Sequence, residues 1–110
     1  MTPLEEYAQH SPMWAEGLSK LPERMHGGLV RYIMHGIPPG NFLIAVLKGD
    51  LFESLSRADD ENRHLLWQYG NFLHNFSPLG CYGSPKHFDE WCKCGGLLGL
   101  EKACEGEVTS

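Results

Sequence analysis

The carboxylates of one short stretch are the densest set of side chains that could do chemistry. The set is Asp50, Glu53, Asp59, Asp60 and Glu61. A divalent metal ion would need such oxygens to converge from different turns, and the spacing of an EF-hand is absent. Helix capping and a solvated acidic face explain most of these residues. The remaining role is a docking surface for a protein with a basic surface, because opposite charges steer association.

Cysteines and histidines are the next candidates for chemistry. The cysteines are Cys81, Cys92, Cys94 and Cys104, with His87 among them. Structural zinc usually takes cysteines two to four residues apart, and Cys92 and Cys94 would point away from each other on a helix. Cys81 near a helix N-terminus would have a lowered pKa, but no base stands at a fixed spacing from it. We therefore expect buried or idle thiols, no metal, no cofactor and no enzyme.

A corner rich in proline and glycine, His35–Asn41, raises the alternative of a ligand site. Its two prolines remove N–H donors that a phosphate cradle would use, so a rigid corner between helices is the favoured interpretation. The segment Arg24–Gly49 nevertheless carries cations and no carboxylate. The alternative is a pocket for a small anionic molecule, such as a nucleotide, lined by Arg31, His35, Asn41, Lys48, Cys81 and Tyr82.

Length, composition and net charge limit the classes of protein that fit either hypothesis. The chain has 110 residues, 42% hydrophobic and 21% charged, with a net charge of −5. These values predict one compact domain over residues 1–110, small enough for a homodimer to add stability. The negative charge argues against a nucleic-acid partner. A helix-turn-helix over Arg24–Lys48 would also place the apolar run Phe42–Leu47 where a recognition helix needs polar side chains. The acidic start and short apolar runs predict a cytoplasmic protein without a membrane span.

The elements that must position these residues are all helices. Ser11-Pro12, Asp50 and Ser84-Pro85 have the pattern of helix starts, Asn41 is a candidate cap, and glycines mark the ends. No strand periodicity occurs, so the prediction is an all-α domain of five or six short helices. The longest would run from Asp60 to Phe76 and bury the stripe Leu65, Leu66, Tyr69, Phe72, Leu73 and Phe76.

Three further expectations concern apolar residues and the end of the chain. Met13 is expected to face inward, as are Leu51, Phe52 and Leu55 on a short helix. Trp67 lies off the apolar stripe, so it either contacts a second face or is an exposed anchor at an interface. The last residues, 105–110, are expected to form a loose tail.

Four motifs resemble those of a family of small accessory proteins encoded by tailed bacteriophages and prophages. They are the corner Tyr32–Gly40, the apolar helix Phe42–Leu51, the element Arg57–Asn62 and the turn Gly80–Pro85. The similar core covers about residues 28–96. The resemblance implies a phage accessory product in a host bacterial cell, and such proteins often act by binding host nucleases, defence complexes or polymerase subunits. It therefore suggests a non-enzymatic inhibitor of host antiviral defence, comparable to an anti-CRISPR protein.

Overall fold

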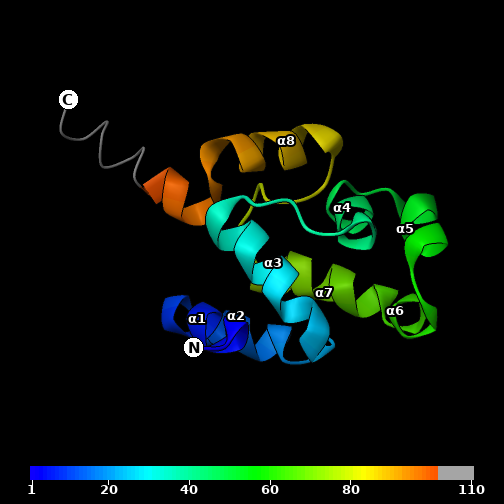
Figure 1. The fold of residues 1–110 in the computed structure, drawn as a ribbon, viewed down its shortest axis with the longest axis horizontal. Coiled ribbons are helices and arrows are strands. Elements are labelled where there is room, and N and C mark those ends of the chain that lie inside the picture. Colours follow the sequence, from blue (N-terminus) through cyan, green and yellow to red (C-terminus); the bar gives the residue numbers. More distant parts are fainter. Residues whose placement is uncertain (102–110) are drawn as a thin grey trace.

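Nine helices and no strands make up the part of the chain that the computed structural model describes, residues 1–101 (Figure 1). The helices are α1 (Pro3–His10), α2 (Pro12–Leu18), α3 (Glu23–His35), α4 (Asn41–Leu47), α5 (Leu51–Arg57), α6 (Asp60–His64), α7 (Leu66–Phe76) and α8 (Pro85–Cys94), and residues 96–101 are helical again. The all-α prediction is confirmed. The expected tail, residues 105–110, lies outside the described residues.

Short polar side chains begin most of these helices. The oxygens of Thr2, Ser11, Asp50, Asp59 and Ser84 each accept a hydrogen bond from the backbone N–H three residues later. Such caps satisfy N–H groups that a helix start leaves without partners. The predicted cap at Asn41 is wrong. Gly40 is the N-cap residue of α4, and Asn41 is the first residue inside the helix.

The long helix predicted from Asp60 to Phe76 is two helices. At Leu65 the backbone takes φ −100° and ψ 7°, which ends α6 and begins α7. On either side of the break, the hydroxyl of Tyr69 donates to Oδ1 of Asn62 over 2.6 Å, and both residues are buried. This break is one reason why the structure has more helices than the five or six expected.

The core surrounds α3, which crosses the middle of the molecule (Figure 1). Three tyrosines in it, Tyr7, Tyr32 and Tyr69, are at most 1% exposed, and the first two donate hydrogen bonds to distant segments. Tyr7 donates to the carbonyl of Phe76 over 2.6 Å, and Tyr32 donates to the carbonyl of Cys81 over 2.7 Å. The hydroxyls thus join α1 to the end of α7, and α3 to the turn before α8, without leaving a buried polar group unpaired. Within residues 1–101, no helix has both the length and the apolar character needed to cross a membrane.

The corner His35–Asn41 connects α3 to α4, as the sequence predicts. Gly36 ends α3 in the left-handed conformation, with φ 71°. It packs directly on the backbone that ends α8. A Cβ atom at Gly36 would lie 2.8 Å from the nitrogen of Gly96 and 2.9 Å from the carbonyl oxygen of Trp91. The indole N–H of Trp91 also donates to the carbonyls of Tyr32 and Ile33 at the end of α3. The corner is therefore a packing joint between two helix ends.

Two predictions of burial are wrong. Met13 is 60% exposed on α2, and on α5 Leu51 and Phe52 are 56% and 81% exposed. On α5 the buried residue is Ser54, whereas Leu55 is only half-buried. Ala58, the residue directly after the helix, is also buried. The hydroxyl of Ser54 satisfies itself by donating to the carbonyl of Asp50, so a small polar residue can face inward and the large apolar residues face solvent.

Candidate functional site

The carboxylates singled out in the sequence gather at one end of the molecule. Asp50 caps α5, Glu53 lies in its first turn, and Asp59, Asp60 and Glu61 begin α6. Figure 1 shows α5, α6 and the start of α7 together at that end, away from α1 and α2. The sequence prediction that these residues share a surface is consistent with this arrangement.

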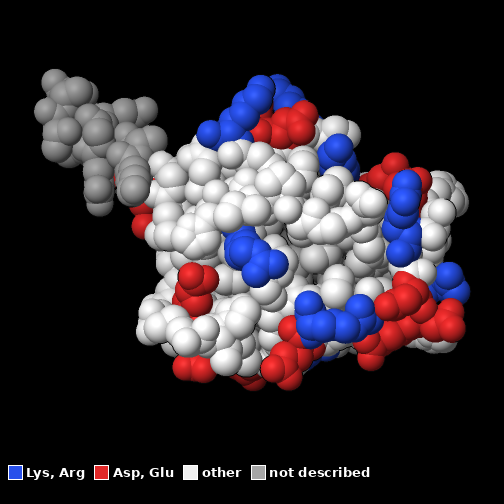
Figure 2. Space-filling view, viewed as in Figure 1, with Lys and Arg blue, Asp and Glu red and all other residues white. Residues whose placement is uncertain are grey.

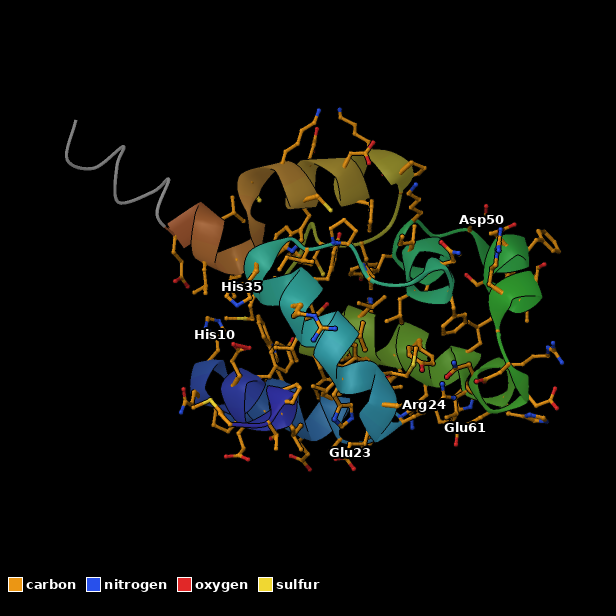
Figure 3. All side chains as sticks on the ribbon, viewed as in Figure 1. His10, Glu23, Arg24, His35, Asp50 and Glu61 are labelled. Carbon is orange, nitrogen blue, oxygen red and sulfur yellow. The ribbon has the colours of Figure 1, made fainter. Side chains whose placement is uncertain are left out.

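Arginines pair with four of these five carboxylates. Arg57 lies 2.7 Å from Glu53, Arg63 lies 3.2 Å from Asp60, and Arg24 lies 2.8 Å from both Asp59 and Glu61. Figure 3 shows Arg24 of α3 beside Glu61, and Figure 2 shows acidic and basic atoms interleaved along this edge. Five carboxylates face three guanidiniums, so the surface is less acidic than the sequence suggests. The side chains in these pairs are about half-exposed or more, so the pairs contribute little to stability.

Asp50, the fifth carboxylate, and Asp59 also accept hydrogen bonds from backbone N–H groups. Oδ1 of Asp50 accepts from the N–H of Glu53 over 3.0 Å. Oδ1 of Asp59 accepts from the N–H of Asn62 over 2.8 Å, and this bond, followed by the charge of Arg24, lowers the pKa of Asp59. Both carboxylates are therefore needed for the local fold, and changing either would alter more than surface charge.

Large apolar side chains are exposed on α5 and at the start of α7. Leu51 and Phe52 project from α5, and Trp67 in the first turn of α7 is 67% exposed. Trp67 confirms the prediction that it lies off the buried stripe. Sequence reasoning missed Phe52, because its spacing from Leu55 imitates an inward face. It also missed Arg24, Arg57 and Arg63. The last two stand four and three residues after Glu53 and Asp60, which is a detectable signal.

The residues of the alternative ligand site have separate partners. Nε2 of His35 lies 3.7 Å from the carboxylate of Glu6, and the ammonium of Lys48 lies 5.2 Å from the ring centre of Phe88. Arg31 is exposed on α3 and Tyr82 is half-buried. Asn41, exposed at the start of α4, lines a cavity with Arg24 and Arg57 rather than with Arg31 and Lys48. The expected grouping of these six residues is therefore not what the structure shows.

Cys81, the last member of that alternative site, cannot contact a ligand. It is 0% exposed, and its thiol donates weakly to the hydroxyl of Ser77 at 3.6 Å. Burial raises the pKa of Cys81 to about 11, so the expectation that a helix N-terminus lowers this pKa is wrong. Cys92 and Cys94 are also free thiols, and Cys104 lies outside the described residues. Among residues 1–101, no three His, Cys, Asp or Glu side chains are placed to hold a metal ion.

Thiol labelling should reflect these environments. In the native protein at mildly alkaline pH, we expect iodoacetamide to modify Cys92 and Cys94 much faster than Cys81, because the thiolate of Cys81 is disfavoured and shielded. Mass spectrometry of peptides from native and urea-treated samples measures the difference. Equal native rates at all three residues would contradict the buried position of Cys81.

The helical fold and the end formed by α5 and α6 define the class of protein: a small all-α domain that displays exposed apolar side chains and paired charges. Four of the seven residues of α4 are buried: Phe42, Leu43, Ala45 and Leu47. Comparisons with protein-family models, curated proteins and solved structures find no match to the chain. Its function must therefore be argued from the surface itself.

Proposed function

We propose that the chain is a non-enzymatic protein that binds another protein through a docking surface at the α5–α6 end. The docking surface consists of Leu51, Phe52 and Trp67 with the carboxylates Asp50, Glu53, Asp59, Asp60 and Glu61. The exposure of Phe52 and Trp67 on this one end carries the proposal. Aromatic side chains left in solvent gain most when a partner covers them, and they are frequent among residues that dominate binding energy.

The partner that fits this surface is a protein with a basic surface. The chain carries a net charge of −5, and at this end five carboxylates outnumber three arginines. Complementary charge of this kind raises association rates and selects partners. The arginines hold the carboxylates in place before binding, so a basic partner meets ordered oxygens rather than mobile side chains.

The finer proposal concerns the biological setting. The motifs Tyr32–Gly40, Phe42–Leu51, Arg57–Asn62 and Gly80–Pro85 resemble those of phage accessory proteins. On that basis the partner is a host bacterial protein, and the most specific candidate is a component of a cytoplasmic antiviral defence system that the chain inhibits. Such components bind nucleic acid and are therefore basic, which is the chemistry that the docking surface requires.

Affinity capture with matched variants tests the docking surface. We expect Phe52→Ser and Trp67→Ser each to reduce the retained amount of a basic host protein at least tenfold, measured by quantitative mass spectrometry of a bacterial lysate. The controls are Met13→Ser and Leu79→Ser, which remove apolar side chains that are 60% and 88% exposed away from this end. Equal losses in all four variants, or no loss at Phe52 and Trp67, would reject this surface.

Charge reversal needs a position without a structural role. Reversal of Asp59 would remove the cap of α6 as well as a surface charge. Asp60 is the better choice, because its side chain is 93% exposed and its only side-chain hydrogen bond in the described residues is the pair with Arg63. The Asp60→Lys variant separates the contribution of charge to binding from the integrity of the fold.

A further inference from the structure

A second feature lies beside the docking surface, where α3, α4, α5 and α6 meet. Residues from these four helices enclose a cavity of about 270 Å³ that opens to solvent. Met25 and Phe42 supply apolar walls, and Gly40 leaves the space next to it open, since nothing lies within 4 Å of where its Cβ would be. Arg24 and Arg57 lie on its lining. The cavity can hold a small molecule or a single functional group.

Asn62 lines this cavity and has a side-chain NH2 group without a partner in the described residues. It is 3% exposed, and its Oδ1 accepts the hydrogen bond from Tyr69. Its Nδ2 has no hydrogen-bond partner in residues 1–101. No fully buried side-chain nitrogen or oxygen in those residues lacks a partner, so this Nδ2 must retain access to solvent. Asn62 is among the residues that line the cavity, so a ligand in the cavity can contact its side chain. A buried side-chain NH2 group without a partner has two N–H donors available for a ligand.

The other polar groups of the cavity also have donors to spare. Among residues 1–101, Arg57 uses only its Nε, toward Glu53, which leaves the N–H groups of both terminal nitrogens without a partner in that part of the chain. The side-chain amide of Asn41, which also lines the cavity, makes no hydrogen bond within the described part of the chain. Both oxygens of Asp59 are already occupied, one by the N–H of Asn62 and one by Arg24. Donors therefore supply most of the free hydrogen-bonding capacity, and Oδ1 of Asn41 is an acceptor among them.

We propose that this cavity binds a small oxyanion, either a carboxylate or a phosphate group. The oxygens would accept from the fork of Arg57 and from the amides of Asn62 and Asn41. Arg57 suits such a ligand, because a guanidinium can donate two parallel hydrogen bonds to one carboxylate or phosphate. The lining charges are two arginines against one aspartate. Glu53 and Glu61 lie outside the lining, and Glu53 engages only Nε of Arg57, so an anion can reach the terminal nitrogens of Arg57 while this pair stays in place.

Nuclear magnetic resonance titration of the isolated protein tests this site, using inorganic phosphate and sodium succinate as probes. Sodium chloride at matched ionic strength is the blank. We expect the side-chain amide signals of Asn62 and Asn41 and the Nε signal of Arg57 to shift and saturate with at least one probe. Arg57→Gln should weaken the apparent affinity at least tenfold. The control is Arg63→Gln, which removes an arginine of α6 that pairs with Asp60 but does not line the cavity.

The two probes distinguish the source of the oxyanion. Saturation with phosphate alone assigns a phosphate-bearing ligand, and saturation with succinate alone assigns a carboxylate. Shifts that rise linearly, that chloride reproduces, or that Arg57→Gln and Arg63→Gln reduce alike would overturn the proposal. The test uses no protein partner, so its outcome is independent of whether the docking surface is correct.

Discussion

Substitution of Gly96 by alanine is expected to destabilise the protein strongly, because Gly96 lies against the backbone at the end of α3. Gly96 has φ 72°, and a Cβ there would lie 2.6 Å from the backbone nitrogens of Gly36 and His35. Because those atoms belong to the backbone that ends α3, they cannot move aside as a flexible side chain would. The left-handed conformation costs roughly 1–2 kcal/mol and overpacking roughly 1–3 kcal/mol, so we expect a loss of about 2–5 kcal/mol. Urea denaturation followed by circular dichroism measures it.

Gly70 provides the matched control for Gly96. It lies inside α7, and no atom lies within 4 Å of where its Cβ would be. Alanine there should stabilise the protein by about 0.5–1 kcal/mol, because glycine costs conformational entropy in a helix interior. Opposite signs at the two glycines would establish the contact between the ends of α3 and α8. A Gly96→Ala protein as stable as the wild type would show that these two backbones are farther apart than described.

The second large effect is expected at the hydrogen bond between Tyr69 and Asn62. Tyr69→Phe keeps the ring, which packs edge-on against Phe42 with centres 5.2 Å apart, but removes the hydroxyl. Oδ1 of Asn62 would then be buried without a donor. An unsatisfied buried polar group costs about 1–3 kcal/mol, and we expect a loss of stability in that range. Urea denaturation again measures it.

A double-mutant cycle separates this bond from general damage to the core. Asn62→Leu alone leaves the hydroxyl of Tyr69, which is 1% exposed, without a partner. The double variant removes both polar groups, so it should lose less stability than the two single changes added together. Simple additivity would indicate that the two side chains do not interact. This bond joins α6 to α7 and also orients the amide that faces the oxyanion cavity.

Local chemistry made most of the helices predictable. Ser11 and Ser84 before prolines, and Asp50 three residues before Glu53, are caps that act on their immediate neighbours, so the sequence alone reveals them. Leu65 carries no such signal. It is neither glycine nor proline, and the apolar stripe continues through it, so the break between α6 and α7 depends on tertiary contacts such as Asn62 with Tyr69.

The candidate site was predictable in its carboxylates and in Trp67, but not in what surrounds them. Arg24 stands 35 residues before Asp59, and no local rule connects the two. In sequence, Arg24 belongs to an electropositive stretch, whereas in space it pairs with Asp59 and Glu61 of the acidic end. The prediction that Phe52 is buried is wrong because a seven-residue helix is too short for residue spacing alone to determine which side faces the core. Ser54 took the inward position instead.

Site-specific photo-crosslinking tests the docking surface most directly. A photoreactive benzoylphenylalanine at position 52 would stand on α5, and the same residue at position 79 would stand beyond the opposite end of α7. Irradiation in a bacterial host followed by mass spectrometry would identify the attached protein. The proposed function predicts one basic host protein crosslinked from position 52 and not from position 79. A partner crosslinked from position 79 and never from position 52 would contradict it.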